Sequence, residues 1–438
     1  MFSPQAQAIL TRLEQAGYQA FAVGGCVRDT LLGRTPGDWD ITTSALPQQV
    51  MALFDAVPTG IAHGTVTVRL EGRGFEVTTF RGDGPYLDGR HPSGVVFTRH
   101  LEEDLARRDF TVNAMAMDLR GRITDPFGGR EDLQRRLLRC VGDPERRLQE
   151  DALRILRALR FAAVLGFSVE PETAAALVHQ AHRLDLIAPE RVSHELQRLL
   201  TGAYVGPVLR QFAPVLAAVL PEIRPLMGFE QHSPHHRYDV WEHTVRSVET
   251  IPPQPVLRWT MLLHDVAKPQ CFTLDEQGKG HFYGHDAQGA AMAEEILRRL
   301  RLPRRDTERI VLLIREHMRQ MAPTEKSVGR ALHRLGPETL GQLLAVQRAD
   351  RLATGTGDTE LLDKIQALLE KLLAEERCFT LRQLAVNGRD LMALGLAGPA
   401  VGRMLQQLLA QVLEGTLPND HAALLDAAQR SLEEQENP

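Results

Sequence analysis

Cysteine is scarce in this 438-residue sequence, which has only Cys26, Cys140, Cys271 and Cys378. No two of them form a Cys-x-x-Cys pair, so we expect free thiols in a reducing compartment and neither a disulfide framework nor a zinc–cysteine site. Long apolar runs are also missing, since no segment approaches the ~18 apolar residues of a membrane span. The segment 1–17 lacks the apolar core of a secretory signal. These absences predict a cytoplasmic protein that does not enter a membrane.

Lysine is nearly as scarce, because only five of the 51 basic residues are lysines. The formal net charge of −5 argues against a general, charge-driven attraction to nucleic acid. Any RNA binding must therefore come from local basic faces, since neutralising phosphates requires clustered cations. Arginine suits that task because its guanidinium can contact a phosphate through two donors at once. A bias in genome composition explains the excess of arginine equally well.

Strand and helix patterns divide the chain. The alternating runs Thr65–Leu70 and Gly74–Phe80, around a glycine-containing turn, predict a β-hairpin in the first part. From about residue 143 onward, Leu-, Ala- and Arg-rich amphipathic patterns predict helices alone. We therefore expect an α/β head with a small mixed sheet, followed by an all-α neck and body, a second helical domain and a helical tail. The predicted parts are residues 1–140, 141–227, 228–355 and 356–438.

The most informative stretch is Phe21–Ile41, where an apolar run breaks at two glycines and a segment carrying Arg28 leads to Asp38 and Asp40. If a strand begins there, its period of two places both carboxylates on one face. Paired carboxylates can hold Mg²⁺, which takes its other ligands from water and substrate phosphates. The glycines let the backbone approach a phosphate chain, and Arg28 can clamp a phosphate. Taken alone, each of these motifs is more often a surface turn.

The order Gly-Gly-x-Val-Arg-Asp and then Asp-x-Asp resembles the first signature of the bacterial class II tRNA nucleotidyltransferases, the CCA-adding enzymes, and of the related bacterial poly(A) polymerases. The resemblance implies that Asp38 and Asp40 hold Mg²⁺ and that Gly25 and Arg28 contact a nucleoside triphosphate. It also implies that Glu76, on the predicted hairpin, supports the catalytic pair as a third carboxylate. An ordinary exposed strand glutamate is the alternative for Glu76.

A second signature follows at Arg107–Ala114. A solvated helix end is the ordinary interpretation of such a charge cluster. In the family that the chain resembles, the position of Arg108 reaches the triphosphate, and Asp109 and Asn113 would shape the site or the ribose pocket. The implied reaction is in-line attack of an RNA 3′-OH on the α-phosphate with pyrophosphate leaving, assisted by two Mg²⁺ ions.

A third feature is Glu150–Arg160, in which Asp151, Arg154 and Arg157 are spaced i, i+3 and i+6 and would lie on one slowly drifting helical face. A surface helix with an ion pair normally explains such spacing. Because other positions supply the apolar face, a carboxylate acceptor beside a guanidinium fork can instead present an edge that accepts C or A and rejects G and U. This matches the family's Glu-Asp-x-x-Arg motif. Arg157 and Arg160 would then support the base or the phosphates.

Between Phe80 and Phe97 the sequence is rich in glycine and proline and predicts a long loop. In the family such a loop helps to position the RNA 3′ end for the final A, and shortened loops mark enzymes that add only C. The loop here, with Arg90 inside it, has full length. We therefore expect addition of CCA to tRNA from CTP and ATP. The alternatives are A-only or CC-only addition, poly(A) synthesis, or an RNA-end phosphohydrolase with an inactive head.

A second set of metal-ligand residue types is spread over residues 228–355. Each alone is more simply a packed or exposed residue, but an unpaired His-Asp pair at the end of an apolar helix would be costly. In sequence order the set resembles the ligands of HD phosphohydrolases. The resemblance implies a divalent metal (Ni, Mn, Fe, Zn or Mg) that activates water for phosphate-ester hydrolysis at RNA 3′ ends, on cyclic phosphates or 2′-phosphates. The residues are His243, His264, Asp265, His285, His317 and Asp350.

Three further features concern RNA or structure. His232, His235 and His236 precede the predicted metal-binding domain and are interpreted as substrate-side or structural residues. The arginine-rich segment 298–309 is a solvated face by default, with contact to a tRNA backbone as the alternative. The segment 386–419 resembles the C-terminal RNA-binding part of family members that carry an HD domain.

Overall fold

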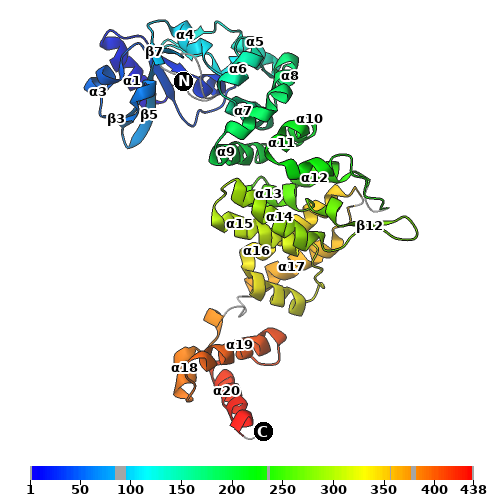
Figure 1. The fold of residues 1–438 in the computed structure, drawn as a ribbon. Coiled ribbons are helices and arrows are strands. Elements are labelled where there is room, and N and C mark those ends of the chain that lie inside the picture. The colour runs from blue at the N-terminus through cyan, green and yellow to red at the C-terminus, as the bar shows by residue number, and fades with distance from the viewer. Residues whose placement is uncertain (1, 84–94, 234–236, 356, 376–380, 437–438) are drawn as a thin grey trace. The chain divides into compact units, whose positions relative to one another are not determined.

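The computed structural model describes residues 2–83, 95–233, 237–355, 357–375 and 381–436. It divides the chain into two compact units. Residues 1–224 and 298–302 form the N-terminal unit, and the rest of the chain forms the C-terminal unit. The α/β beginning and the helical remainder, as predicted, are visible in Figure 1. The finer division at residues 140, 227 and 355 stays a prediction.

A seven-stranded mixed sheet organises the start of the N-terminal unit, with the strand order β3-β4-β5-β2-β1-β8-β9. Strand β2 pairs antiparallel with β1 and parallel with β5. It therefore lies at the centre of the sheet, between the strand before the glycines and the second strand of the predicted hairpin. The strands are β1 (Ala20–Val23), β2 (Asp40–Thr43), β3 (Ala56–Gly60), β4 (Thr65–Leu70), β5 (Arg73–Thr79), β8 (Ala116–Met117) and β9 (Ile123–Thr124).

The predicted hairpin is confirmed as β4 and β5, which pair antiparallel from Thr65 to Thr78. Its turn residues Glu71 and Gly72 both have positive φ, at +50° and +75°. Two successive positive φ values are typical of the tight turn that matches the twist of a hairpin. The same alternation places the buried Phe75 and Val77 on one face of β5 and the exposed Glu76 on the other.

Helices cover one face of this sheet. α1 (Pro4–Gln15) contacts β1 and β2, and α3 (Pro47–Leu53) contacts β4 and β5. The buried Ile41 and Val77 are neighbours in register. Asp40 and Glu76 therefore belong to the alternate set of positions, which point away from that apolar layer. The short elements α2 (Gly25–Leu31), α4 (Leu101–Ala106), η2 (Thr111–Asn113) and α5 (Gly129–Arg135) complete the head.

The predicted long loop begins and ends as a two-stranded ribbon of β6 (Arg81–Asp83) and β7 (Val95–Phe97). Arg81 pairs with Phe97 in this ribbon, so both described ends of the predicted loop are strands. Residues 84–94, which include Arg90, lie outside the described part of the chain.

The remainder of the N-terminal unit is mainly helical, with one short parallel pair of strands, β10 (Leu137–Leu138) and β11 (Ser168–Val169). Its centre is α7, of whose 13 residues 11 are buried. α7 packs against α9 and α10, so it faces protein on most of its circumference. The helices are α6 (Pro144–Glu150), α7 (Leu153–Leu165), α8 (Pro171–His179), α9 (Pro189–Leu200), α10 (Val205–Gln211) and α11 (Ala213–Val219).

Within its described residues, the C-terminal unit is helical apart from the hairpin of β12 (Phe272–Leu274) and β13 (Gly280–Phe282). The longest helix, α16 (Glu325–Ala353), is interrupted at Gly336, whose φ of +74° is not helical, just before Pro337. α17 (Glu360–Ala374) packs against α16 around a shared apolar core. The other helices are α12 (Val240–Thr250), α13 (Pro255–Leu263), α14 (His285–Arg299) and α15 (Arg304–Glu316).

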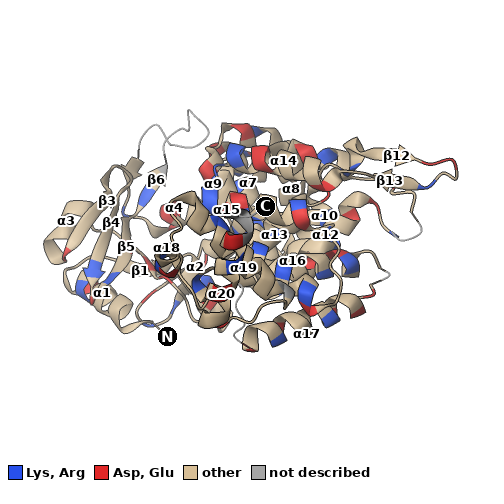
Figure 2. Ribbon diagram, turned by 90° about the horizontal axis from the view of Figure 1, so that it is seen from below, with Lys and Arg blue, Asp and Glu red and all other residues tan. Residues whose placement is uncertain are grey.

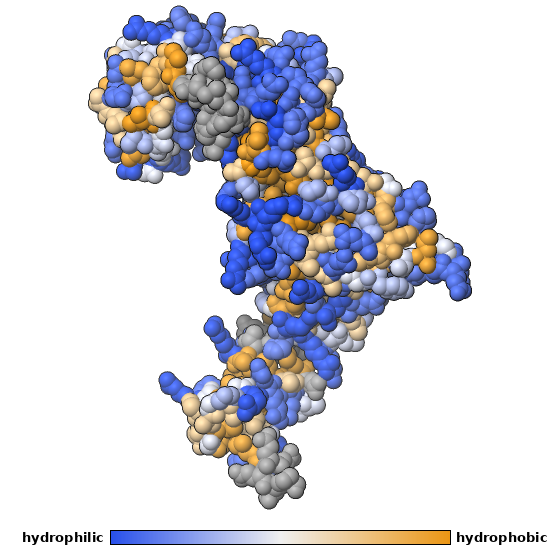
Figure 3. All heavy atoms as spheres, in the orientation of Figure 1, coloured by the Kyte–Doolittle hydropathy of each residue, from blue (hydrophilic) through white to orange (hydrophobic). Residues whose placement is uncertain are grey.

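The last described segment has a small core of its own, formed by residues such as Leu391, Leu408 and Leu424. Its helices are α18 (Gly388–Ala393), α19 (Pro399–Glu414) and α20 (His421–Glu436). On the face shown in Figure 3, hydrophobic residues occur in small groups among hydrophilic ones. Across the described residues, no helix combines the length and apolar character needed to cross a membrane.

Candidate functional sites

Three carboxylates gather where β2 begins. Asp40 is the first residue of β2, and the parallel pairing of Ile41 with Val77 brings Glu76 beside it. Asp38 precedes the strand by two residues. Desolvation, followed by charge repulsion within the group, raises the pKa of Glu76, and desolvation together with Asp38 also raises the pKa of Asp40. An all-oxygen donor set whose members repel one another suits Mg²⁺, a hard cation that binds oxygen.

The turn at Gly24 brings a cation to this cluster. Gly24 has a φ of +79°, and a Cβ atom there would lie 3.2 Å from Arg108 Nη1 and 3.7 Å from Asp40 Oδ2. Only glycine combines this backbone conformation with such a close approach. Arg108 lowers the pKa of Asp40 and so opposes the effects of desolvation and Asp38. The structure therefore brings the second sequence signature to the first.

The side chain that anchors Arg108 escaped the sequence analysis. Asp104 on α4 is fully buried, and its carboxylate accepts hydrogen bonds from Arg107 Nη2 at 2.8 Å and Arg108 Nη2 at 3.4 Å. It also accepts one from Thr42 Oγ1 on β2 at 3.2 Å. Burial alone would raise the pKa of Asp104, but the two arginines outweigh it and the pKa is lowered. The i+3 and i+4 spacing to the arginines was the available signal.

Gly25 and Arg28 lie on α2, one turn apart. A Cβ atom on Gly25 would lie 3.6 Å from Arg28 Nη2. Arg28 is buried and donates to Asn113 Oδ1 at 2.7 Å and to Asp29 Oδ1 at 2.9 Å. Asn113, on η2, thus holds the guanidinium that the sequence assigned to a phosphate. The prediction that Asn113 shapes the site or the ribose pocket stays a prediction.

Asp151 departs from the sequence prediction. The expectation of one helical face carrying Asp151, Arg154 and Arg157 is wrong, because α6 ends at Glu150 and α7 begins at Leu153. Asp151 has an extended backbone, with φ of −141°. Its Oδ1 accepts a hydrogen bond from Leu153 N at 3.0 Å, and its Oδ2 lies 3.6 Å from Arg191 Nη2. Aspartate competes for nearby backbone donors in this way, which is why it favours helix starts.

Arg154 lies on α7 but its contact with a carboxylate is to Glu150, at 2.7 Å. Its guanidinium also donates to the carbonyl oxygens of Arg147, at 2.8 Å, and Arg107, at 2.9 Å. These bonds tie α7 to α6 and to the Arg107–Arg108 segment. The prediction that Asp151 and Arg154 stand side by side and select the base stays a prediction.

Arg157 does reach the second signature. It donates to Asp109 Oδ2 through Nε at 2.8 Å and Nη2 at 2.5 Å. Burial alone would raise the pKa of Asp109, but Arg157 outweighs it and lowers the value to about 2. Asp109 is thus a charged link between α7 and η2, since its Oδ1 also accepts from Asn113 Nδ2 at 3.2 Å.

Arg160 lies in a different environment. Its Nε is 2.7 Å from Glu195 Oε2 on α9, and both side chains are buried. Burial lowers the pKa of Arg160 to about 10. The guanidinium also lies 4.1 Å from the centre of the Phe161 ring. These contacts fix α7 against α9. The support of the base or the phosphates by Arg160 stays a prediction.

Three family models match the chain. The poly A polymerase head domain matches residues 20–139, the probable RNA and SrmB-binding site of polymerase A matches residues 166–226, and the putative tRNA nucleotidyltransferase domain 2 matches residues 286–428. Individual relatives cover nearly the whole chain. The CCA-adding enzyme of Geobacillus stearothermophilus is 37% identical over 423 residues, which are 95% of this chain and 94% of that protein. The chain belongs to the CCA-adding enzyme family.

Other relatives agree with this membership. The CCA-adding enzyme of Limosilactobacillus fermentum is 37% identical and covers 98% of this chain and 96% of that protein. Among solved structures, the Bacillus stearothermophilus CCA-adding enzyme in complex with CTP has a TM-score of 0.75 at 32% identity, with 99% of both chains covered. The sequence resemblance to this family and the predicted fold class are therefore confirmed.

The C-terminal unit of this family member contains a second cluster. The predicted ligands His243 (α12), His264 and Asp265 (after α13), His285 (start of α14) and His317 (after α15) have ligand atoms that converge. His243 Nε2 lies 3.3 Å from His264 Nε2 and 2.9 Å from Asp350 Oδ1 on α16. His285 Nε2 lies 3.3 Å from His317 Nε2. Two ring nitrogens at this distance need a proton or a cation between them.

The backbone orients three of these histidines. The Nδ1 atoms of His264, His285 and His317 each donate to the carbonyl oxygen three residues earlier, at 2.6 to 2.7 Å. Each Nε2 lone pair is then available on the inner side of the cluster. A hydrogen bond from the outer ring nitrogen to a backbone carbonyl commonly fixes the orientation of histidines that bind a metal. The donor set of imidazoles and carboxylates fits Mn, Fe, Ni or Zn as well as Mg.

The sequence analysis did not single out Lys268 and Gln231, which lie beside this cluster. Lys268 Nζ lies 2.7 Å from Asp265 Oδ2 and donates to Gln231 Oε1 at 2.9 Å, with little of its side chain exposed. Its i+3 spacing from Asp265 was a usable signal. A pocket of about 130 Å³, lined by His317, Asp350 and neighbouring residues, opens beside the cluster.

The structure also describes part of the histidine group before the predicted metal-binding domain and the arginine-rich segment 298–309. His232 adopts a φ of +47°, and its carbonyl oxygen accepts from Gly280 N at 2.8 Å, which makes it a structural anchor of the β12–β13 hairpin. His235 and His236 lie outside the described residues.

Figure 2 shows acidic residues among the basic ones on α14. In the 298–309 run, Arg299, Arg301, Arg304 and Arg309 form ion pairs with Glu222, Glu190, Glu308 and Glu338.

Proposed function

We propose that this protein is a template-independent tRNA nucleotidyltransferase that builds the 3′-terminal CCA from CTP and ATP. The observation that carries the proposal is the meeting of Asp38, Asp40 and Glu76 with Arg108 at the Gly24 turn, in a chain that belongs to the CCA-adding enzymes. Acidic oxygens beside an arginine and a close-approach glycine are the parts that nucleotidyl transfer requires. The enzyme would act in the cytoplasm, where tRNA matures.

The transferred group is held by residues of the N-terminal unit. Asp38 and Asp40 would hold Mg²⁺, and Glu76 would support them. Two bound Mg²⁺ ions would lower the charge on the α-phosphate and on the departing pyrophosphate. Arg108 offers donors to the triphosphate, and the bare backbone at Gly24 and Gly25 leaves room for it. The RNA 3′-OH attacks the α-phosphate in line with the leaving pyrophosphate, so positioning supplies much of the rate.

Base selection would use Asp151, Arg154 and Arg157. Arg154 is held by Glu150 and by the carbonyl oxygens of Arg147 and Arg107. Arg157 is held by Asp109, so both guanidiniums have defined directions. Asp151 supplies an acceptor from the break between α6 and α7. A donor fork and an acceptor can bond to the edges of C and A, and leave G and U with unmatched polar groups. Arg28 would support the phosphates through its remaining donor capacity.

The test uses tRNA ending at the discriminator base, at C, or at CC, each incubated with CTP or ATP. Full CCA addition predicts that the first two accept CMP and the third accepts AMP. Acceptance of AMP alone by the CC-ending tRNA would instead identify an A-only enzyme, and long A tails would identify a poly(A) polymerase. Asp38→Ala should abolish all transfer, whereas Asp151→Ala should let GTP or UTP be used. Unchanged nucleotide choice in the Asp151 variant would refute its role.

A second function is proposed for the His/Asp cluster: metal-dependent hydrolysis of phosphate esters at RNA 3′ ends. The three Nδ1 bonds to backbone carbonyls support it, because they prepare the Nε2 atoms as ligands. A bound divalent metal would supply an activated water. The test is metal content after purification together with hydrolysis of 2′,3′-cyclic AMP. His264→Ala should lose both while keeping CCA addition; retained hydrolysis would contradict the proposal.

A further inference from the structure

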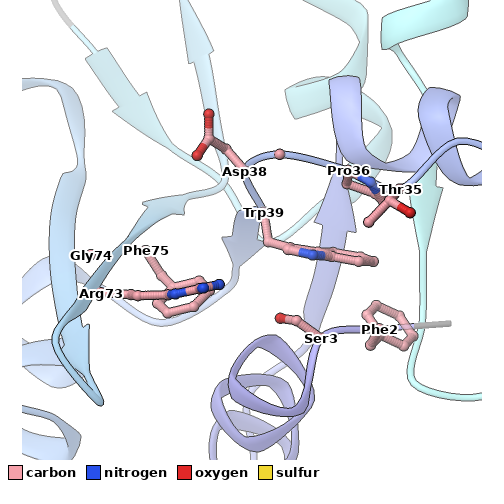
Figure 4. Close-up of a pocket in the computed structure, with 10 residues that line it drawn as sticks. Phe2, Ser3, Thr35, Pro36, Asp38, Trp39, Arg73, Gly74 and Phe75 are labelled. Atoms are coloured by element: carbon pink, nitrogen blue, oxygen red, sulfur yellow. The ribbon is translucent and has the colours of Figure 1, made fainter.

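The carboxylates of the proposed transferase site share one face of the sheet with a threonine. Figure 4 shows the Asp38 carboxylate pointing away from the ring of Trp39, which extends into a pocket of about 690 Å³. Side chains alternate in this way along a strand, so Asp40 and Thr42 on β2 point to the same face as Asp38. Asp40 is exposed on this face, whereas Thr42 is fully buried. A group that contacts Thr42 therefore lies on the metal-binding side of the sheet.

Helix α4 supplies that group. Its residue Leu105 belongs to one apolar cluster with Val23, and Val23 pairs in register with Asp40. Paired residues of antiparallel strands have their side chains on the same face. α4 is therefore fixed on the face that carries the carboxylates. Asp104, the residue before Leu105, accepts a hydrogen bond from Thr42 Oγ1 at 3.2 Å.

Asp104 has two arginine partners. Its fully buried carboxylate accepts from Arg107 Nη2 at 2.8 Å and from Arg108 Nη2 at 3.4 Å, and a buried charge without such partners would be costly. The bond with Arg108 uses only one end of the guanidinium. At the other end, the position that a Cβ atom of Gly24 would take lies 3.2 Å from Arg108 Nη1 and 3.7 Å from Asp40 Oδ2. Arg108 Nε has no hydrogen-bond partner in the described structure.

The guanidinium of Arg108 thus lies between two carboxylates that compete for it. Opposite charges a few ångströms apart attract strongly where water is partly excluded. A direct ion pair with Asp40 would cancel the negative charge that a metal ion needs there. Asp104 opposes this movement from the buried side, where Thr42 and Arg107 hold its carboxylate in place. The ion pair that Arg108 makes is with Asp104.

We propose that Asp104 is a positioning residue of the transferase site, which acts by holding Arg108 away from the metal-binding carboxylates. Asp38 and Asp40 then stay free for Mg²⁺, and Nη1 of Arg108 stays free for the triphosphate. The inference rests on the proposed transferase function. It gives the buried carboxylate a role in metal affinity that its packing alone does not require.

Asp104→Asn tests this role, because it keeps the shape of the side chain and removes its charge. Arg108 should then move toward Asp38 and Asp40, and Mg²⁺ has to displace it. The Mg²⁺ concentration for half-maximal transfer should rise about tenfold, which corresponds to the loss of one hydrogen bond between charged groups. The KM for tRNA should not change.

Asp118→Asn is the matched control, because Asp118 is another buried carboxylate of the same unit with an arginine partner, Arg122, four residues later. It should lower the melting temperature and leave the Mg²⁺ requirement unchanged. In an Arg108→Gln background, Asp104→Asn should have no further effect on metal affinity, since no guanidinium is left to hold. A further loss in that background would indicate a direct charge effect and overturn the positioning role. A rise in the Mg²⁺ requirement of the Asp118 variant equal to that of Asp104→Asn would also overturn it.

Binding of Mn²⁺ without nucleotide, followed by the EPR signal of the free ion, provides a measurement that needs no turnover. The site to be counted is the one that Asp40→Asn removes. Asp104→Asn should weaken this site about tenfold. Thr42→Val, which removes only the hydroxyl bonded to Asp104, should weaken it less and replaces Asp104→Asn if that variant does not fold. Unchanged Mn²⁺ affinity in the variant that folds would overturn the proposal.

The same measurement separates this inference from the proposed function. If the wild type binds Mn²⁺ at the site that Asp40→Asn removes but transfers no nucleotide to tRNA, the transferase proposal fails. The Mn²⁺ affinities of the Asp104 and Asp118 variants still decide whether Asp104 holds Arg108 away from the carboxylates.

Discussion

The two groups of candidate metal ligands, one in each compact unit, are held in different ways. In the N-terminal unit, Asp38 and Glu76 are exposed, and the donor atoms are all oxygens. In the C-terminal unit, His243, His264 and Asp265 are buried, and backbone carbonyls fix the rings that flank them. The first group is open enough for the proposed Mg²⁺ to arrive with a nucleotide, whereas the buried second group would retain the metal proposed for it. We therefore expect an exchanging ion in the N-terminal unit and a resident ion in the C-terminal unit.

The largest effect should come from removing one oxygen ligand of the first group. Asp40→Asn keeps the shape but removes the charge, and should lower CMP and AMP transfer by about 10³-fold, because metal binding stabilises the transition state by several kcal/mol. Single-turnover transfer to tRNA measures this. Metal content of the C-terminal unit should not change. A variant with more than a tenth of the wild-type rate would remove Asp40 from the proposed site.

The second largest effect should come from removing metal, to which the two groups of ligands should respond differently. After dialysis against EDTA, transfer should return at once when Mg²⁺ is added back. The C-terminal unit should meanwhile have lost a stabilising ligand, worth about 4 kcal/mol if that metal is present at a thousand times its Kd. Thermal unfolding followed with metal analysis tests this, and Asp265→Asn serves as the control that has no metal to lose. Identical melting of the wild type before and after dialysis would argue against a resident ion.

A smaller effect is expected at the Gly24 turn. Gly24→Ala forces a side chain into a φ of +79° and places its Cβ 3.2 Å from Arg108 Nη1, so transfer should fall about tenfold along with stability. Gly33→Ala is a matched control, since Gly33 has a φ of +70° but open space around it. It should cost a similar free energy of unfolding, about 1 kcal/mol, and leave transfer intact. Equal transfer rates in the two variants would show that Arg108 is not held by this turn.

The smallest predicted effect concerns pH. The pKa values of Asp40 and Glu76 are raised in the folded protein, so their contribution to stability is greatest at acidic pH and is lost as pH rises through the folded pKa values. At pH 7 without Mg²⁺, Asp40→Asn should therefore melt about 1–2 °C higher than the wild type, and the difference should vanish on acidification. Thermal scans across pH check this. A lower melting temperature for the variant at pH 7 would contradict a repulsive cluster.

The sequence was sufficient where a local rule or the family resemblance indicated a position. The hairpin pattern predicted that Glu76 lies on a strand, and the family resemblance implied that it joins Asp38 and Asp40. The six members of the C-terminal cluster were predicted from their resemblance, in sequence order, to the ligands of HD phosphohydrolases. The cost of an unpaired His-Asp pair at the end of an apolar helix supported that interpretation. The fold class followed from the strand and helix patterns.

The sequence was insufficient where a partner came from a distant element or where a helix broke. Asp104 follows two glutamates and drew no prediction, yet it is buried and accepts hydrogen bonds from Thr42 and two arginines. Arg160 has a position like that of Arg157 in the motif, but its partner Glu195 lies 35 residues away on α9. No spacing rule within α7 could indicate that contact.

Glu150 and Asp151 are neighbours in the chain but lie in different local structures. Glu150 is the last residue of α6 and accepts a hydrogen bond from Arg154, whereas Asp151 lies in the two-residue connection between α6 and α7. If Asp151 contacts the incoming base as proposed, the acceptor lies in a short connection between two helices, whereas Arg154 lies on α7 and is bonded to Glu150. Small rotations of residues 151–152 would let the Asp151 carboxylate bond to a pyrimidine or to a purine, while the buried helix α7 keeps its position.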